Sequence, residues 1–311
     1  MTEHLDFTGR VAVVTGAGQG IGRAYAELLA ARGASVVVND LGTGTAGSGV
    51  DGSRARSAAD AIVAAGGSAV PDTSDISTPE GAAQVVQTAI DAFGKLDIVI
   101  NNAGIFALAV FPDIEPDDLR RMYDVHIAGT FNVTRAAWPH LVDSDAGRVV
   151  LTISTSTFGA ANTMAYGMAK AGILGMGRAI ALAGEPEGIK VNMVAPQAMT
   201  RMMSTGMGIG EDFPDAPDRV PALVAPLVAV LSHESCPVNG ESYVSGMRRA
   251  SRMFLGESDG YVHPSLDLTP EDILEHWSEI SDNGAEAAVS DVMKFSVRQA
   301  SLLQATTVAT S

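Results

Sequence analysis

Tyr166 and Lys170 are the two side chains whose types and spacing could move a proton, because they stand at positions i and i+4. On a helix this spacing puts both groups on one face. A free phenol titrates near ~10, and lowering that value by about 3 units requires about 4 kcal/mol of preferential stabilisation of the phenolate. An ammonium group one turn away could supply part of it. The pair alone is a common exposed arrangement, so its meaning depends on what else the chain carries.

A glycine-rich segment supplies a second chemical signal. Gly16, Gly20 and Gly22 directly follow the β-branched run Val11–Thr15 and open an Ala/Leu-rich stretch up to Ala31. In that setting glycines let the backbone approach a pyrophosphate, and the helix start offers free N–H groups to it. The alternative is a tight turn needed only for packing.

Asp40 ends the next apolar run, 20 residues after Gly20. A carboxylate there can accept hydrogen bonds from the adenosine ribose hydroxyls and would repel a 2′-phosphate. No Lys or Arg stands within the glycine segment or directly beside Asp40. The sequence therefore favours NAD over NADP, and the alternative is a capping or loop aspartate. A bound nicotinamide ring would add positive charge near a phenolate.

The elements that must position these residues alternate between strand and helix. This alternation of apolar strands with helices predicts an α/β fold, a single doubly wound Rossmann domain whose parallel sheet has helices on both faces. The expected strands are 11–15, 35–39, 68–71, 96–101, 148–153 and 190–194, and the expected helices are 23–31, 53–65, 79–93, 119–142 and 166–183.

Three segments interrupt this rhythm. Residues 41–51 form a Gly/Thr/Ser loop, and residues 199–226 have the Met/Gly/Pro/Asp composition of a substrate-binding loop or of a mobile one. We expect residues 1–245 to form the NAD-binding domain with its catalytic site and this loop. Residues 246–311 then form a C-terminal extension packed on or near it rather than an independent domain, with a helix beginning after Thr269.

Composition excludes several classes of partner. The 311 residues carry a formal net charge of −16, which argues against nucleic acid and against an anionic membrane surface. Cys236 is the only cysteine, and the five histidines other than His126 have no metal-binding spacing, so we expect no metal. The first ten residues lack the apolar core of a signal peptide. These features predict a soluble, cytoplasmic protein.

Taken together, these motifs resemble the short-chain dehydrogenase/reductase family. The resemblance runs from about residue 7 to residue 245 and includes Thr15–Gly22, Asp75, Asn101–Gly104, Ser154, Tyr166, Lys170, Asn192 and Pro196. It implies that Tyr166 accepts or donates the proton, that Ser154 holds the substrate oxygen, and that Lys170 binds the nicotinamide ribose and shifts Tyr166. The implied cofactor contacts are Gly16, Gln19, Gly20, Ile21, Gly22, Asp40, Asp75, Ile76, Asn102, Ala103, Gly104, Tyr166, Lys170, Pro196 and Thr200.

The chain departs from the family pattern at three places. His126 stands where the family usually has the asparagine of a proton relay, and a histidine relay would make activity sensitive to pH near ~6.5. Ser154 lies 12 residues before Tyr166, one fewer than usual, which leaves Ser156 as a less favoured alternative. Gln197 replaces the glycine that usually follows Pro196.

A closer resemblance, carried by Val36–Gly42, Val133–Trp138 and Ala225–Cys236, is to one branch of the family. This branch contains the (3R)-hydroxyacyl-CoA dehydrogenase domains of peroxisomal multifunctional enzymes, and a histidine is common there at the position of His126. The implied reaction is NAD-dependent interconversion of (3R)-3-hydroxyacyl-CoA and 3-oxoacyl-CoA. The alternatives are a 17β-hydroxysteroid or other secondary alcohol as substrate, and a non-catalytic NAD-binding protein.

Two further expectations concern partners. Coenzyme A is a polyanion, so an acidic chain needs local positive charge to bind it. Arg248, Arg249 and Arg252, with Lys294 and Arg298 later, could supply that charge, or could equally form salt bridges with the protein's own carboxylates. The family resemblance also implies a homodimer or homotetramer built on the long helices.

Overall fold

The computed structural model describes residues 4–44, 46–47, 49–108, 110–206, 217–266, 268–282, 287–288, 293 and 296–302. The chain divides into two compact units, Met1–Arg252 and Met253–Ser311. The sequence predicted that the NAD-binding domain ends at residue 245, and the first unit runs to Arg252. Its sheet has eight strands, two more than the six that the sequence predicted.

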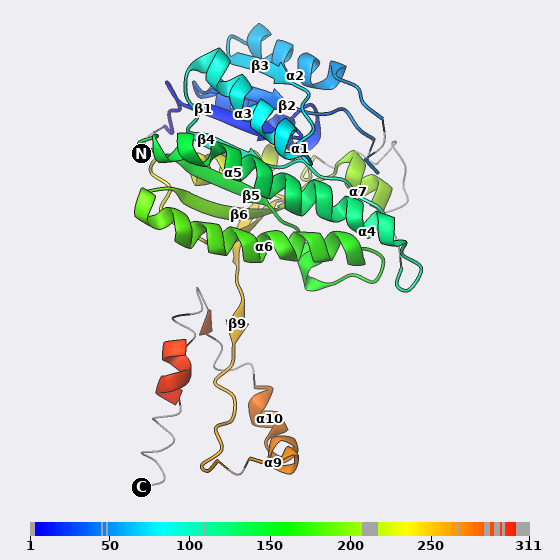
Figure 1. Ribbon diagram of the computed structural model, residues 1–311, viewed down its shortest axis with the longest axis vertical. Helices are drawn as coiled ribbons and strands as arrows, with labels where there is room; N and C mark the ends of the chain where they lie inside the picture. Colours follow the sequence, from blue (N-terminus) through cyan, green and yellow to red (C-terminus); the bar gives the residue numbers. More distant parts are fainter. Residues whose placement is uncertain are drawn as a thin grey trace. The chain divides into compact units, whose positions relative to one another are not determined.

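The first unit is built on an eight-stranded sheet with the order β3-β2-β1-β4-β5-β6-β7-β8 (Figure 1). Neighbouring strands from β3 to β7 pair in parallel, and most of the central strands are completely buried. This confirms the predicted doubly wound α/β fold. The strands are β1 Val11–Thr15, β2 Ser35–Asn39, β3 Ser68–Asp72, β4 Ile98–Asn101, β5 Arg148–Thr152, β6 Lys190–Gln197, β7 Ser242–Gly246 and β8 Arg249–Met253.

Helices cover both faces of this sheet. The helices α1 (Gly20–Ala31), α2 (Ser53–Ala64) and α8 (Ala225–Ser232) share one face, where α1 contacts the other two. On the opposite face α3 (Pro79–Phe93) packs against α5 (Gly129–Val142), and α6 (Met164–Gly184) packs against β6. Right-handed crossovers between parallel strands produce this two-sided arrangement.

The segment predicted as one helix over 119–142 is divided into three parts. It consists of α4 (Pro116–Met122), a π-helical turn over Tyr123–Ala128 and then α5. The apolar pattern of the sequence indicated helix correctly but does not reveal a change of hydrogen-bond period. Single π-helical turns inside longer helices occur frequently at functional sites, and this one carries His126.

The loop 199–226 and the second unit contain short elements, most of which were not predicted. The loop 199–226 includes α7 (Arg201–Gly206) and the 3₁₀ turn Pro221–Leu223, and its two ends are tied by a hydrogen bond from the Met199 N–H to the Arg219 carbonyl (2.6 Å). The second unit contains β9 (Gly256–Glu257), α9 (Pro270–Glu275), α10 (Trp277–Ile280) and β10 (Ala287–Ala288). The helix expected after Thr269 is α9, and Thr269 caps it.

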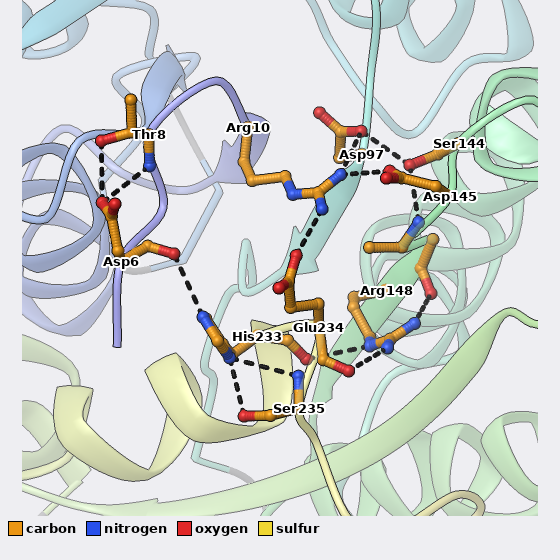
Figure 2. A network of polar contacts seen from close by, with 12 residues as sticks. Asp6, Thr8, Arg10, Asp97, Ser144, Asp145, Arg148, His233, Glu234 and Ser235 are labelled. Carbon is orange, nitrogen blue, oxygen red and sulfur yellow. Dashed lines mark hydrogen bonds and ion pairs between the residues drawn. The ribbon is translucent and has the colours of Figure 1, made fainter. Parts of the chain in front are cut away.

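A polar network ties together the amino ends of the central strands (Figure 2). Arg10, just before β1, forms ion pairs with Asp145 and Glu234 and lies 3.6 Å from Asp97. The buried Arg148 at the start of β5 donates hydrogen bonds to the backbone carbonyls of His233 (3.0 Å) and Glu234 (2.7 Å). These bonds fix the amino edge of the sheet, and the residues predicted to do chemistry follow its carboxyl ends. No helix in the described ranges is long and apolar enough to cross a lipid bilayer.

Candidate active site

Ser154 and Tyr166 meet where β5 ends and α6 begins. Ser154 follows β5, and its hydroxyl accepts the N–H of Ser156 (3.1 Å) at the start of a 3₁₀ turn. Tyr166 lies in the first turn of α6, and its phenol is hydrogen-bonded to Ser154. The structure therefore pairs Tyr166 with Ser154, the residue favoured over Ser156 despite the shortened spacing.

Burial sets the protonation of Tyr166. Desolvation raises the pKa of Tyr166 to about 12, and the hydrogen bond from Ser154 lowers it only in part. The protein's own groups thus shift this phenol in the direction opposite to the one the sequence suggested. Work as a base at neutral pH requires additional positive charge at the site, because a shift of one pKa unit corresponds to about 1.4 kcal/mol.

Lys170 lies one turn further along α6 and is almost completely buried. Its Nζ donates a hydrogen bond to the Thr152 carbonyl (2.7 Å) and lies 5.7 Å from the centroid of the Tyr166 ring. Desolvation lowers the pKa of Lys170 to about 7. The ammonium is thus held in place by the end of β5, close to the phenol, and in an environment that a nearby negative charge would stabilise.

Two aromatic rings hold the Tyr166 ring from its sides. Phe106 and His126 both pack edge-to-face against it, with centroids 5.1 Å and 5.4 Å away. His126 is fully buried, and its Nε2 lies 2.8 Å from the Ile105 carbonyl oxygen and 3.3 Å from the Ile105 backbone nitrogen. Because a carbonyl oxygen can only accept, the shorter contact favours the tautomer with the proton on Nε2. The other ring nitrogen, Nδ1, is buried with no hydrogen-bond partner among the described residues.

The position of His126 corrects one expectation. Burial, with a smaller contribution from the charge of Lys170, lowers the pKa of His126 to about 3. The ring is therefore neutral throughout the physiological range, and the sensitivity near pH ~6.5 suggested by the sequence does not follow from this side chain. Gly104 packs directly on it, since a Cβ added to Gly104 would lie 2.4 Å from Cε1 of His126.

The glycine segment forms a tight turn from β1 into α1. Gly16 and Gly20 have φ values of +62° and +60°, and a Cβ on Gly22 would lie 2.3 Å from the carbonyl oxygen of Gly16. Gln19 precedes α1, and its side chain makes no capping hydrogen bond. This geometry fits the cradle that a dinucleotide pyrophosphate requires: close backbone approach and N–H groups at a helix start.

Asp40 orders both sides of this cradle. Its carboxylate accepts the N–H of Gly18 (2.9 Å) and the N–H of Gly42 (2.8 Å). The sequence has no basic residue directly beside Asp40, but the fold brings Arg54 to the same place: its Cβ lies 2.9 Å from where a Cβ on Gly18 would stand. The Arg54 guanidinium donates to the Thr43 carbonyl (2.7 Å) and lies 3.9 Å from Asp51. Such a neighbour is visible only after the chain folds.

Asn102 links the glycine turn to the end of β4. Its amide donates to the carbonyls of Thr15 (3.0 Å) and Gly16 (3.1 Å). The Thr15 hydroxyl in turn accepts the N–H groups of Asn102 and Ala103, each at 3.0 Å. In this structure these residues therefore support the cradle by holding its backbone.

The other predicted cofactor residues lie at the same carboxyl edge. Asp75 is exposed after β3 and accepts hydrogen bonds from Ser77, and the neighbouring Ile76 is buried. Thr200 lies beside the glycine turn, its Cγ2 being 3.9 Å from where a Cβ on Gly20 would stand. Ile21 packs on the core from α1. Pro196 and the unusual Gln197 continue β6 as regular parallel partners of β7.

The basic residues predicted near the C-terminus are partly engaged by the protein itself. Arg252 forms a bidentate pair with Glu241, with both contacts at 2.7 Å, and Arg298 pairs with Glu257 and Asp259. The salt-bridge alternative is thus correct for these two residues. Lys294 lies outside the described residues, and Arg248 and Arg249 are exposed.

Comparison with known proteins shows the family of the chain. Residues 10–209 match the family model described as "short chain dehydrogenase". The chain is 40% identical over 292 residues to the mouse peroxisomal multifunctional enzyme type 2, covering 91% of this chain and 38% of that protein. It is 39% identical over 284 residues to a short-chain type dehydrogenase/reductase of Mycobacterium tuberculosis, covering 90% and 96% of the two chains.

A solved structure extends the similarity to the fold. The full-length peroxisomal multifunctional enzyme type 2 of Drosophila melanogaster superposes with a TM-score of 0.78 at 30% identity, covering 96% of this chain and 50% of that one. This chain thus spans 38% of the mouse protein and 50% of the Drosophila protein. It belongs to the short-chain dehydrogenase/reductase family. As a member it is an oxidoreductase that acts on CH–OH groups with a nicotinamide cofactor.

Proposed function

We propose that this protein is an NAD-dependent dehydrogenase that interconverts (3R)-3-hydroxyacyl-CoA and 3-oxoacyl-CoA. The observation that carries the proposal is the arrangement of Ser154, Tyr166 and Lys170. At the carboxyl edge of the sheet, the Tyr166 phenol is hydrogen-bonded to Ser154. The centroid of its ring lies 5.7 Å from Nζ of the buried Lys170. That arrangement suits proton transfer to or from the oxygen of a secondary alcohol.

In the oxidation direction, Tyr166 takes the proton of the substrate hydroxyl, and Ser154 holds the same oxygen while it becomes a carbonyl. The glycine turn and Asp40 would hold NAD, which would supply the acceptor for the hydride on the carbon that bears the oxygen. Lys170 holds positive charge near the phenol and is fixed by the Thr152 carbonyl. His126, neutral and bonded to Ile105, positions the Tyr166 ring from one side.

His126 is also the candidate for the relay position. Its Nδ1 is a buried acceptor, and Lys170 is close enough for its charge to lower the pKa of the ring. We propose that Nδ1 accepts a hydrogen bond on the path by which protons reach Lys170, without the ring itself becoming charged.

NAD is the cofactor that the cradle favours. The Asp40 carboxylate already accepts two backbone N–H groups, and its remaining lone pairs can accept the ribose hydroxyls. A 2′-phosphate would meet this negative charge. The Arg54 guanidinium is engaged by Thr43 and Asp51, which supports the same preference.

The substrate proposal is supported by the named relatives, since two of the most similar proteins are peroxisomal multifunctional enzymes. A 17β-hydroxysteroid or another bulky secondary alcohol is the second candidate, because the same proton-transfer site would serve it. Residues 207–216 of the loop predicted to bind substrate lie outside the described residues, and the hydrogen bond between Met199 and Arg219 joins the parts on either side.

Oligomeric state and location complete the proposal. Large apolar side chains are exposed on α5 and α6, among them Phe131 (47%), Met168 (46%) and Leu182 (49%). We propose that these helices form the interface of a homodimer or homotetramer, which would bury these apolar side chains. Cys236 is a buried free thiol, which fits the reducing cytoplasm in which we place the enzyme.

The experiment is NADH formation from NAD⁺ with (3R)- and (3S)-hydroxyacyl-CoA and a 17β-hydroxysteroid. Selective turnover of the (3R) thioester supports the proposal. Turnover of the steroid alone would show that the substrate is a steroid and not an acyl-CoA. Turnover of the (3S) thioester alone would contradict the proposed (3R) stereochemistry. A run with NADP⁺ in place of NAD⁺ tests the cofactor in the same assay.

A further inference from the structure

A cavity lies at the carboxyl ends of β6 and β7, outside the residues placed in the proton-transfer site. It has a volume of about 200 Å³ and is lined by Gln197, Val244, Gly246, Met247 and Arg249. These residues come from the ends of β6 and β7 and from the hairpin that joins β7 to β8. The cavity therefore belongs wholly to the first unit.

The hairpin that forms one wall has an unusual backbone. Its two central residues, Met247 and Arg248, have φ values of 52° and 60°, in the left-handed region that favours glycine. Gly246 lets the hairpin approach β6, because a Cβ there would lie 2.1 Å from the carbonyl oxygen of Gln197. Conformations of this kind persist where surrounding contacts hold them, and they concentrate at ligand-binding sites.

The hairpin also presents positive charge that the protein leaves available. Arg252 is neutralised by its bidentate pair with Glu241. Among the residues that the structure describes, no carboxylate pairs with Arg248 or Arg249, although the chain has 36 acidic residues. Arg249 lines the cavity, and Arg248 precedes it in the same hairpin. Guanidinium groups are suited to phosphate, which they bind with charge-assisted and often bidentate hydrogen bonds.

The distance to the reacting atoms suits a ligand with an extended arm. Ser154 follows β5, and β8 lies three strands further along the sheet. Three spacings of about 4.8 Å put the hairpin roughly 14 Å from the end of β5. One ligand can span this interval only if its reacting group and its phosphates are separated by a long linker, which is the form of a coenzyme A thioester.

We propose that the cavity at the β7–β8 hairpin binds the phosphate groups of coenzyme A, with Arg249 as the principal contact and Arg248 as the second. This inference rests on the proposed function for its ligand class. In this proposal, coenzyme A is recognised away from the proton-transfer site. Loss of the phosphate contacts therefore weakens binding of the thioester and leaves the chemical step intact.

The kinetic test compares two thioesters of the same acyl group, one of coenzyme A and one of N-acetylcysteamine, which has no phosphate. Arg249→Gln is expected to raise KM for the coenzyme A thioester about 10-fold or more, as loss of a charged hydrogen bond does. KM for the N-acetylcysteamine thioester and kcat for both substrates should stay unchanged. Arg120→Gln, which removes an exposed charge from α4, is the matched control and should change neither KM.

Direct titration of coenzyme A into the protein provides a readout that does not need turnover. Arg249→Gln should weaken Kd for coenzyme A by the same factor, and Arg248→Gln by a smaller one. If no thioester is turned over but coenzyme A binds in an Arg249-dependent way, the proposed reaction fails and the phosphate site stands. Equal Kd and KM values for wild type and both hairpin variants would overturn the site.

Discussion

Substituting Gly104 with alanine is expected to displace the Tyr166 phenol through the His126 ring, without direct contact between residue 104 and Tyr166. A Cβ at Gly104 would lie 2.4 Å from Cε1 of His126, whereas carbon atoms in contact prefer about 3.5 Å or more. The His126 ring must therefore move by about 1 Å. It is fully buried and bonded to Ile105, and it packs edge-to-face on Tyr166, so the displacement is transmitted to the phenol.

Two magnitudes follow from this geometry. Overpacking of a buried site typically costs about 1–3 kcal/mol of stability, and a misplacement of about 1 Å at a reacting group can lower the rate about 10²-fold. The assays are urea unfolding, and kcat at saturating cofactor and substrate. Gly175→Ala is the control: it lies on α6, the helix that carries Tyr166, and a Cβ there meets nothing within 4 Å, so it should leave kcat unchanged and stabilise the helix slightly.

A second variant separates steric transmission from other effects. Combining Gly104→Ala with His126→Asn removes part of the ring that the new Cβ meets, so the stability lost in the single variant should return in part. Gly104→Ala with the kcat and unfolding midpoint of the wild type would refute the reasoning, because the ring would then have room that the structure does not show.

Three further predictions concern other contacts. Asp40→Ala removes the acceptor that orders Gly18, so it should weaken NAD binding about tenfold and reduce the preference for NAD over NADP⁺. The preference is measured as the ratio of the kcat/KM values for the two cofactors, and an unchanged ratio would contradict this role. Arg148→Met should lower the free energy of unfolding by about 2–4 kcal/mol in urea titrations, because it removes the buried guanidinium that donates to the carbonyls of His233 and Glu234, and a loss below about 0.5 kcal/mol would contradict it. Lys170 has a pKa of about 7 in the folded protein, against an ordinary value of 10.5. Between these pH values the unfolded chain binds more protons than the folded one, so the contribution of Lys170 to the free energy of unfolding rises with pH. Urea unfolding at pH 7 and pH 9 should show this rise in wild type and a smaller one in Lys170→Met, and equal slopes in both would contradict the assignment.

Much of the fold could be predicted from the sequence because the strands at its centre are unbroken β-branched runs. β1 and β2 begin and end where predicted, as does α3, which has Thr78 as its N-cap and Gly94 as its C-cap. The β7–β8 hairpin was missed because its strands carry serine, tyrosine and arginine at the edge of the sheet. An edge strand buries too little to leave an apolar pattern in the sequence.

The residues of the site were found more readily than their physical state. Spacing singled out Tyr166 and Lys170, and the resemblance to the family added Ser154; the fold brings the three residues together at the end of β5. The pKa values of Tyr166 and Lys170 could not be predicted, because they depend on burial by residues distant in the sequence such as Phe106. The engagement of His126 by Ile105 likewise depends on the π-helical turn, which no sequence pattern indicated.

We propose that Tyr166 transfers the proton, and that the site binds its cofactor independently of the phenol group. The most direct measurement compares wild type with Tyr166→Phe, using NADH formation from a (3R)-hydroxyacyl-CoA together with the Kd for NAD measured by titration. Because phenylalanine keeps the ring that packs on Phe106 and His126, the variant should remain folded and keep Kd within about twofold while kcat falls by about 10²-fold or more. A variant that binds NAD normally and turns over at the wild-type rate would contradict the account.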